Sequence, residues 1–342
     1  MIMNYLSHSG PKVHHGPFSL TMRILITGGF GFIGGRLAAY LSLAGYQVVL
    51  GSRNETHPPN WLPQAEVVQI KWSDESALES SCEGVDVIIH AAGMNAQDCA
   101  ADPLGALDFN GVTTKRLVEA ANRVGVKKFI YLSTAHVYAS PLVGTITEKT
   151  LPNNSHPYAS SHLAGESAVL NTNERGVIQG VVIRLSNTYG APMHKDVNCW
   201  MLVVNDLCRQ AAQTRRLVLQ TSGLQQRDFV CMTEVCRVAE ALIIADGGSV
   251  KNSIFNVGSG VSQSILEIAT LIQQRCSIVL GFEPFLDFKQ AYADEEQPRL
   301  SYKSDHLASV GISVKSMDKV TEIDELLQFC QRAFPKEESI NI

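Results

Sequence analysis

The chain has 342 residues, enough for a large core and more than the ~100–200 residues typical of one domain. Its formal net charge of −5 gives no overall basic field, which argues against nucleic acid as a partner. The longest apolar runs fall short of the ~20 residues that span a bilayer, and no signal-type segment opens the chain. We therefore expect a cytoplasmic protein without a membrane anchor.

The eight cysteines show no C-x-x-C pair and no regular spacing. This pattern favours reduced, mostly buried thiols over a metal site or a disulfide framework. Residues 1–21 are rich in Gly, Pro, Ser and His and show no periodicity, so we expect a disordered extension there.

Residues 23–34, RILITGGFGFIG, predict a buried strand, a tight turn and the start of a helix. Gly28, Gly31 and Gly34 lack a Cβ where one would clash: in the turn, under a pyrophosphate and at the helix–strand contact. Phe32 and Ile33 begin the helix, where unpaired N–H groups and the helix dipole favour phosphate. The stretch predicts a dinucleotide site; the plainer alternative is a tight glycine turn.

The next predicted strand, residues 46–50, leads into Gly51, Ser52 and Arg53, which we expect beside the adenosine ribose. An acid here would bind a free ribose 2′-OH and repel a 2′-phosphate, whereas Ser and Arg suit the phosphate. No acid follows until Glu55. We therefore expect NADP, with NAD as the alternative if Arg53 is only a solvated loop charge.

Strands and helices alternate through the next part of the chain, which predicts an α/β fold with a Rossmann-type, doubly wound parallel sheet. Such a sheet carries its site at the C-terminal edge of the strands. There, the small Ala91 and Ala92 let backbone approach a cofactor closely, and Asn110 points its amide to the same edge unless it is a satisfied surface residue. Strands are predicted at residues 66–70, 85–90 and 127–132, and helices at 75–81 and 104–124.

Two later stretches contain the candidate catalytic residues. Thr134 follows a strand end in YLSTAHVY, and Tyr158 and His162 in PYASSH are four apart, so they share one helix face. Tyrosine serves as an acid or base near pH 7 only if a nearby positive charge stabilises its phenolate. We expect the nicotinamide ring and His162 to do so, while Thr134 hydrogen-bonds the reacting oxygen. The alternative for each residue is a structural role in the core.

Beyond Arg184 the pattern becomes irregular, with helices predicted at residues 197–212, 233–245 and 262–275. This part supplies Asn187, Arg227 and Arg299, polar groups that suit a diphosphate. The alternative for each arginine is surface ion pairing, and that alternative is stronger for Arg299 than for Arg227.

Taken together, the chain resembles the extended short-chain dehydrogenase/reductase family, in its nucleotide-sugar epimerase, dehydratase and reductase branch. The resemblance runs from about residue 23 to residue 311. Its motifs appear in the family's order and spacing: TGGFGFIGG, DVIIHAAG, the helix of Asn110, YLSTAHVY, PYASSH, RLSNTYG, RDFV and FNVGSG.

The resemblance implies a Rossmann domain that holds the nicotinamide cofactor and a smaller C-terminal lobe over a nucleotide-sugar substrate. It implies Thr134 and Tyr158 as the Ser/Thr and Tyr of the catalytic set. Residues matching Asn187 and Arg227 contact the sugar nucleotide and its diphosphate in the family. Family members usually form homodimers through the helices corresponding to residues 104–124 and 158–170.

Three positions depart from the family pattern. The Tyr-x-x-x-Lys motif has His162 in place of the lysine, which normally grips the nicotinamide ribose and lowers the tyrosine pKa. Lys71 stands where an Asp often contacts the adenine. Ala135 and His136 follow Thr134 where sugar 4,6-dehydratases carry an Asp–Glu pair for water elimination, so the chain is expected to be an epimerase or a ketoreductase.

We expect residues 22–185 to form the cofactor-binding domain, with 225–257 packing back onto it. Residues 186–224 and 258–342 then form the substrate lobe. The predicted activity is that of an NAD(P)-dependent nucleotide-sugar epimerase or 4-ketoreductase. Two alternatives are a non-catalytic sensor or scaffold that lost its chemistry with the lysine, and a ketoreductase of the same family that acts on a non-sugar alcohol.

Overall fold

The computed structural model describes residues 22–174, 178–245, 254–289, 298–314 and 318–334. It divides into two compact units. Unit 1 comprises Met1–Tyr138, Leu151–Arg184 and Ala239–Phe255, and unit 2 comprises Ala139–Thr150, Leu185–Val238 and Asn256–Ile342, each as far as it is described. The predicted extension at residues 1–21 lies outside the described residues.

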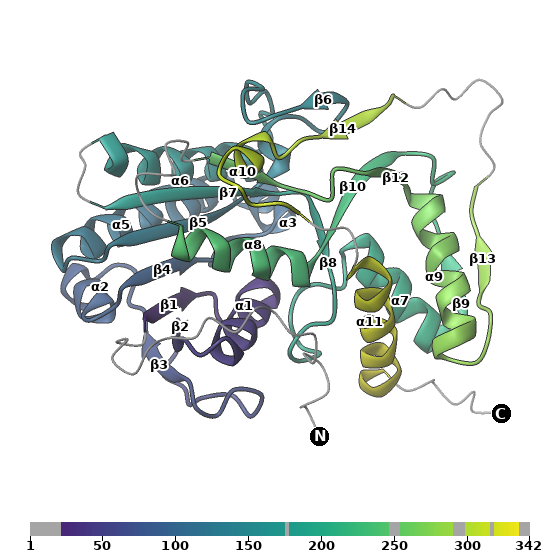
Figure 1. The fold of residues 1–342 in the computed structure, drawn as a ribbon, viewed down its shortest axis with the longest axis horizontal. Coiled ribbons are helices and arrows are strands. Elements are labelled where there is room, and N and C mark those ends of the chain that lie inside the picture. Colours follow the sequence, from purple (N-terminus) through teal and green to yellow (C-terminus); the bar gives the residue numbers. More distant parts are fainter. Residues whose placement is uncertain (1–21, 175–177, 246–253, 290–297, 315–317, 335–342) are drawn as a thin grey trace. The chain divides into compact units, whose positions relative to one another are not determined.

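Unit 1 is built on a seven-stranded sheet in the order β11-β7-β5-β4-β1-β2-β3 (Figure 1). The pairs β1–β2, β2–β3, β1–β4 and β4–β5 are parallel. Strand order therefore reverses beside β1, as in a doubly wound sheet, and the predicted Rossmann-type fold is confirmed. The strands are β1 (Arg23–Thr27), β2 (Gln47–Ser52), β3 (Glu66–Gln69), β4 (Val87–His90), β5 (Lys128–Thr134), β7 (Gln179–Leu185) and β11 (Ile254–Val257).

Helices cover both faces of this sheet (Figure 1). On one face α2, α5 and α6 pack side by side over a core that includes Phe129 and Leu117. On the other face α1 is joined to α8 by a hydrogen bond from Tyr40 to Glu240 (2.9 Å). The helical segments are α1 (Phe32–Leu43), α2 (Glu75–Cys82), α3 (Ala96–Ala101), α4 (Pro103–Ala106), the π-helix η1 (Leu107–Thr113), α5 (Thr114–Arg123), the 3₁₀ turn η2 (Ala135–Val137), α6 (Pro157–Glu174) and α8 (Met232–Ile244).

Unit 2 combines short strand pairs with a three-helix core. Strand β10 (Gln226–Cys231) pairs in parallel with β8 (Asn187–Tyr189) and antiparallel with β12 (Ser262–Ser264). Helices α7, α9 and α11 pack around buried apolar residues such as Leu207, Ile272 and Leu326. The remaining elements are β6 (Gly144–Ile146), α7 (Val203–Thr214), β9 (Arg216–Val218), α9 (Ile265–Val279), β13 (Phe285–Asp287), β14 (Leu300–Tyr302), α10 (Asp305–Ser309) and α11 (Lys319–Ala333).

The structure differs from the sequence expectations in the bounds of some elements and in the division into units. The single helix expected at residues 104–124 is broken by the π-helix η1. The helix expected from residue 197 begins at Val203. Residues 139–150, 185, 225–238 and 256–257, expected on the cofactor-binding domain, belong to unit 2. Strand β10, which lies in this set, pairs there with β8 and β12.

The structure bears on the predictions about the cysteines and about membrane spans. All eight cysteines are buried free thiols. Among the described residues, no helix combines the length and apolar character that crossing a bilayer requires.

Candidate functional site

The glycine turn after β1 is a backbone cradle. Gly28 has φ +67, and a Cβ there would lie 2.8 Å from backbone atoms of Ala91 and Ala92. A Cβ on Gly34 would lie 2.3 Å from the carbonyl oxygen of Gly28. The Gly31 N–H donates to that same oxygen (2.9 Å). The turn and the loop after β4 therefore touch through backbone alone, which leaves no room for side chains at these glycines.

Helix α1 begins in this cradle without a cap. Its first residues are the buried Phe32 and the partly buried Ile33, and Gly31 at the N-cap contributes no side-chain hydrogen bond. No acidic residue lies in the first turn. The unpaired N–H groups and the positive end of the helix dipole therefore suit an anion. Together with the close approach of Ala91 and Ala92, this fits the diphosphate of a dinucleotide.

The end of β2 carries the residues predicted to select the cofactor. Ser52 is partly buried and its Oγ accepts from Asn54 N–H (3.2 Å), which fixes the first turn after the strand. Arg53 is exposed, and its carbonyl accepts from the Gln69 amide (3.2 Å). The carboxylate of Glu66 on β3 is paired with Arg23 (2.6 Å). The turn thus presents a hydroxyl and a guanidinium.

A buried histidine links the end of β1 to the start of α5. His90 Nδ1 lies 2.6 Å from Thr27 Oγ1, and its Nε2 lies 3.0 Å from Thr114 Oγ1. The Thr114 hydroxyl donates to the carbonyl of Asn110 (2.7 Å), so this hydroxyl accepts from His90, which carries its proton on Nε2. Burial lowers the pKa of His90 to about 3, so the ring is neutral.

Asn110, predicted to face the cofactor, is fully buried on the π-helix. Its Oδ1 accepts from Met94 N–H (2.9 Å), and its Nδ2 donates to Ser161 Oγ (3.0 Å). The side chain therefore ties the loop after β4 to α6. Gly111 brings the two helices close, since a Cβ there would lie 2.9 Å from Cβ of Ala164.

The catalytic candidates Thr134 and Tyr158 come together. Thr134 is the last residue of β5, rather than a residue beyond the strand, and its hydroxyl accepts from His136 N–H (3.1 Å). It lies close to Tyr158, which is partly buried in the first turn of α6. Burial raises the pKa of the Tyr158 phenol above its ordinary value, and the neighbouring Thr134 side chain opposes that rise.

His162 lies one helical turn after Tyr158, with the two ring centroids 4.6 Å apart. Its Nδ1 is 2.9 Å from the hydroxyl of Tyr131, a fully buried residue of β5. Burial lowers the pKa of His162 to about 4. The residue at the expected lysine position is therefore a neutral ring, and it places no permanent charge beside Tyr158.

Below this pair, α6 is anchored by a buried ion pair. Arg184 on β7 donates from two nitrogens to Glu166 on α6 (2.9 and 2.5 Å), and the Ser133 hydroxyl donates to the same carboxylate (2.5 Å). Ser133 precedes Thr134 on β5. This network therefore fixes the helix that carries Tyr158 to the strand that carries Thr134.

Sequence reasoning missed Tyr131 and Glu166 as parts of this site. A signal for Glu166 was present, because Tyr158, His162 and Glu166 follow one another at intervals of four and so share one face of α6. No local sequence pattern distinguished Tyr131 from the other residues of the strand that precede Ser133.

The three predicted substrate residues all lie in unit 2. Asn187 on β8 donates to the carbonyl of Asp228 (2.9 Å) on the neighbouring β10. Arg227, also on β10, is half-buried, and burial lowers the pKa of its guanidinium. Arg299 is exposed just before β14, whose Leu300 carbonyl accepts from Ser262 on β12 (2.7 Å). Asn187 and Arg227 are thus brought to adjacent strands, while Arg299 lies in a separate segment.

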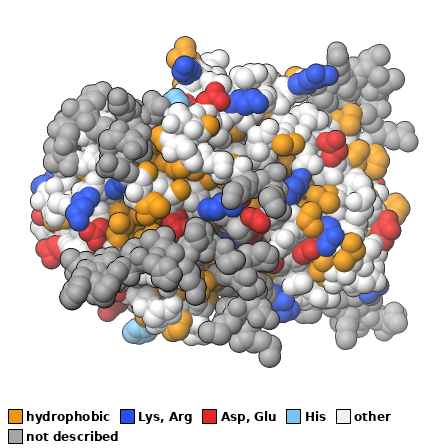
Figure 2. Space-filling model, viewed as in Figure 1, with side chains coloured by type: hydrophobic (Ala, Val, Ile, Leu, Met, Phe, Trp, Pro, Cys, Tyr) orange, Lys and Arg blue, Asp and Glu red, His pale blue; other side chains and the backbone are white. Residues whose placement is uncertain are grey.

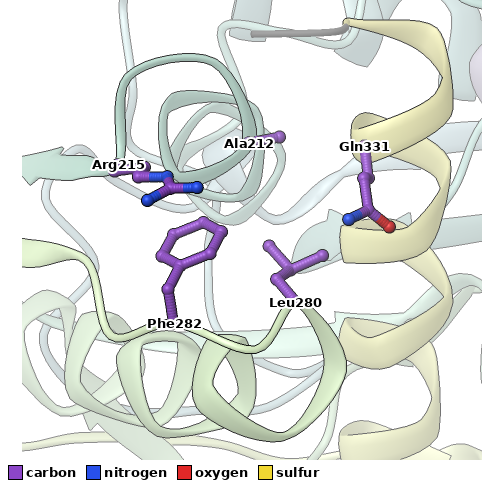
Figure 3. A pocket seen from close by; sticks show the side chains of 5 residues that line it. All are labelled: Ala212, Arg215, Leu280, Phe282 and Gln331. Atoms are coloured by element: carbon purple, nitrogen blue, oxygen red, sulfur yellow. The ribbon is translucent and has the colours of Figure 1, made fainter.

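A cavity in unit 2 of about 140 Å³ lies outside all the predicted sites. It is lined by five residues from α7, α11 and the turns after α7 and α9, and Arg215 there stacks 4.6 Å over the ring of Phe282 (Figure 3). None of the five is an acid, a base near neutral pH or a nucleophile. They are Ala212, Arg215, Leu280, Phe282 and Gln331.

The described residues offer neither a metal site nor, on the face drawn in Figure 2, a surface patch of one charge. No group of three or more His, Cys, Asp or Glu is arranged there to hold a metal ion. On the face drawn in Figure 2, the described basic and acidic side chains are interspersed rather than gathered by sign.

Comparisons with known proteins identify the family and the fold. The sequence profile of the NAD dependent epimerase/dehydratase family matches residues 24–258. The chain is similar to the dTDP-D-glucose 4,6-dehydratase of Mus musculus, at 28% identity over 76% of this chain and 73% of the relative. It is also similar to the UDP-glucose 4-epimerase of Lacticaseibacillus casei, at 31% identity over 72% of this chain and 79% of the relative.

A solved structure shares the fold. The UDP-N-acetylglucosamine 4-epimerase from Methanobrevibacter ruminantium, in complex with UDP-N-acetylmuramic acid, aligns with a TM-score of 0.75 and 18% identity. The alignment covers 91% of this chain and 98% of that one.

Proposed function

This chain belongs to the NAD dependent epimerase/dehydratase family, and we propose that it is an NAD(P)-dependent nucleotide-sugar epimerase or 4-ketoreductase. The observation that carries the proposal is that Thr134 at the end of β5 and Tyr158 in the first turn of α6 lie close enough for Thr134 to affect the pKa of the Tyr158 phenol. This pair lies at the same edge of the sheet as the glycine cradle, since β1, β4 and β5 are consecutive parallel neighbours.

Each residue has a role that follows from its surroundings. Tyr158 exchanges a proton with the sugar hydroxyl or carbonyl, and Thr134 donates a hydrogen bond to the same oxygen. The glycine cradle at Gly28 and Gly34 holds the diphosphate, and His162 orients the nicotinamide ribose. The bound nicotinamide supplies or accepts the hydride.

Water elimination is not part of the proposal. Thr134 is followed by the buried Ala135 and by His136. Neither residue is a carboxylic acid, so the turn after β5 lacks the acid and base side chains that would remove water from a sugar. We therefore propose epimerase or ketoreductase chemistry for this chain, although it is 28% identical to a 4,6-dehydratase over 76% of its length.

We propose NADP as the preferred cofactor, with NAD as a possible second one. Arg53 is exposed at the end of β2, and the nearest β3 carboxylate, Glu66, is already paired with Arg23. A ribose 2′-phosphate would meet a guanidinium and the Ser52 hydroxyl there, without a repelling charge. Preference for NADP favours the reductase over the epimerase, because a reductase releases spent cofactor whereas an epimerase keeps it.

Recognition of the nucleotide sugar is assigned to unit 2. Half-buried Arg227 supplies a guanidinium for the diphosphate, and Asn187 on the neighbouring strand supplies an amide. Arg299 is the third proposed contact.

We further propose a cytoplasmic homodimer. The location rests on the eight buried thiols, which suit a reducing compartment. The dimer rests on exposed apolar side chains along α4 and η1, where Leu104 is 81% exposed and Leu107 is 46% exposed. Sedimentation equilibrium on the wild type and on Leu104→Glu tests the dimer: the variant should be monomeric, and a monomeric wild type would contradict it.

The experiment that tests the reaction uses purified protein, NADPH and 4-keto sugar nucleotides. Stoichiometric loss of NADPH absorbance identifies a reductase, and an isomerised sugar without net loss identifies an epimerase. Tyr158→Phe should lower kcat at least a hundredfold while leaving the NADPH Kd within about threefold. Tyr40→Phe, which removes a hydroxyl on α1 away from the site, is the matched control and should keep full activity.

A second candidate function is a cofactor-binding sensor. It is favoured by the neutral, buried His162 at the expected lysine position, which leaves the Tyr158 pKa raised. In that case Gly34→Ala should abolish both dinucleotide binding and the biological effect, whereas Tyr158→Phe should change neither.

A further inference from the structure

The side chains of Tyr131 and His162 are hydrogen-bonded to each other in the interior of unit 1. Tyr131 is 1% exposed and His162 is 7% exposed. The 2.9 Å contact between Tyr131 Oη and His162 Nδ1 is the one hydrogen bond that either side chain makes to the described residues. The Tyr131 ring is further held between the rings of His90 and His162, with centroid distances of 5.7 and 5.8 Å.

The shared contact allows two arrangements of the protons. If His162 carries its proton on Nδ1, it donates to Tyr131, and the buried phenol O–H then has no acceptor. If His162 carries its proton on Nε2, the phenol donates to the bare Nδ1, and the remaining N–H lies on Nε2, which is not one of the fully buried polar atoms that lack a partner in the described residues. Leaving a buried donor unpaired costs about 1–3 kcal/mol, so the second arrangement dominates.

The charged alternatives are excluded by burial. It lowers the pKa of His162 to about 4 and raises the pKa of Tyr131 well above its ordinary value. Both side chains are therefore neutral near pH 7, and the choice is between the two neutral tautomers alone.

The ring then has its free N–H on the side away from Tyr131. Its Cε1 atom, which is bonded to both ring nitrogens, faces the loop after β4, because a Cβ on Gly93 would lie 3.8 Å from it. That loop also contains Ala91 and Ala92, which pack on the glycine cradle. The Nε2 nitrogen has no hydrogen-bond partner among the described residues.

We propose that Tyr131 is a positioning residue that holds His162 in the Nε2–H tautomer, so that His162 offers a neutral N–H donor to the nicotinamide ribose. The second half of this statement rests on the proposed function. A lysine at position 162 would combine a donor with a fixed positive charge, whereas the Tyr131–His162 pair supplies the donor alone. The Tyr131 phenol fixes the direction of this donor, because it occupies Nδ1 of His162 and leaves only Nε2 to carry the proton.

The first test reads the tautomer in the cofactor-free protein by two-bond ¹H–¹⁵N correlation spectroscopy with ¹⁵N-labelled histidine. His162→Gln and His90→Gln assign the signals. We expect His162 Nδ1 to resonate as an unprotonated nitrogen and Nε2 as a protonated one. In Tyr131→Phe the His162 signals should move toward a mixture of tautomers, while His90, fixed by Thr27 and Thr114, keeps its Nε2–H pattern.

The second test measures the dinucleotide Kd of the same variants by calorimetry. Tyr131→Phe should weaken binding roughly tenfold, as expected for a lost or misdirected hydrogen bond. Tyr40→Phe serves as the control for the loss of a tyrosine hydroxyl from unit 1 and should bind like the wild type.

Three outcomes would overturn the proposal. These are a protonated Nδ1 in the wild type, an unchanged His162 tautomer in Tyr131→Phe, and an altered tautomer with unaltered dinucleotide affinity. The tautomer is read without cofactor or substrate, so failure of the proposed reaction leaves that result standing. A confirmed tautomer with no turnover on any keto sugar would instead point to the sensor.

Discussion

Glu166 and Arg184 form a two-bond ion pair inside unit 1, with side chains only 3% and 4% exposed. The Ser133 hydroxyl donates to the same carboxylate, so the pair joins α6, β7 and β5 at one point. Buried charges of this kind are stable only while both partners are present. The relative positions of Tyr158 and Thr134 therefore depend on a contact that neither of them makes.

Removing one partner should be costly. Glu166→Gln leaves the Arg184 guanidinium buried without a counter-charge and should lower the free energy of unfolding by about 3 kcal/mol. Asp287→Asn breaks the half-exposed pair with Arg216 and should cost less than about 1 kcal/mol. Urea denaturation of the two variants checks this difference, and equal costs would contradict it.

A buried lysine caps the end of α8. Lys128 Nζ donates to the carbonyls of Leu242, Ile243 and Ala245 at 2.7, 2.8 and 2.8 Å. Lys128→Met should therefore lower the free energy of unfolding by about 2–3 kcal/mol, because buried carbonyls lose their donor.

The neighbouring Lys127 provides the control for this prediction. It is exposed and paired with Asp86 at 2.8 Å, so Lys127→Met should leave the free energy of unfolding almost unchanged. Hydrogen exchange at the C-terminal turn of α8 should accelerate in Lys128→Met and remain unchanged in Lys127→Met.

Acid should destabilise the protein through its buried histidines. The pKa of His162 is lowered to about 4 and that of His90 to about 3, whereas both titrate near 6.5 when unfolded. Above pH 6.5 neither state binds a proton and stability is full. As the pH falls from 6.5 toward 4 the unfolded state alone takes up protons, so at pH 5 each histidine costs about 2 kcal/mol.

His162→Gln isolates one of these contributions. The variant should lose about 2 kcal/mol less than the wild type between pH 7 and pH 5, as measured by urea denaturation at both pH values. His57→Gln replaces an exposed histidine of the same unit and should show the wild-type dependence on pH. An unchanged slope in His162→Gln would show that the ring is already charged in the folded state.

Arg53 should determine the choice of cofactor. Arg53→Ala removes the guanidinium at the end of β2 and should raise the NADPH Kd at least tenfold while leaving the NADH Kd unchanged. Glu55→Ala removes an exposed charge two residues away. It should change the NADPH Kd and the NADH Kd by the same factor or leave both unchanged. Wild-type protein that binds NAD but not NADP would refute the role given to Arg53.

The sequence predicted those parts of the site that depend on local pattern. Glycine spacing after an apolar run marked the cradle at Gly28 and Gly34, and the four-residue interval placed Tyr158 and His162 on one face of α6. The strand alternation was sufficient to predict the doubly wound sheet.

Other features depend on contacts between distant residues, which no local pattern reveals. Tyr131 meets His162 across 31 positions of the chain. The π-helix η1 is favoured by close packing on α6, where Gly111 and Gly165 leave room for the neighbouring backbone and for the Tyr131 hydroxyl. The boundary between the two units lies after Val238, inside α8. It reflects the pairing of β10 within unit 2, and no change of composition along α8 marks it.

The contact between the glycine turn and the loop after β4 limits how this protein can evolve. Backbone meets backbone at Gly28, Ala91 and Ala92, so no substitution can reshape that part of the pocket gradually. A bulkier residue on one side would require the whole loop on the other side to move. New ligand preferences should therefore arise at the margins, where side chains such as Arg53 and His162 are proposed to contact the ligand, while the backbone contact at the glycine turn stays constant.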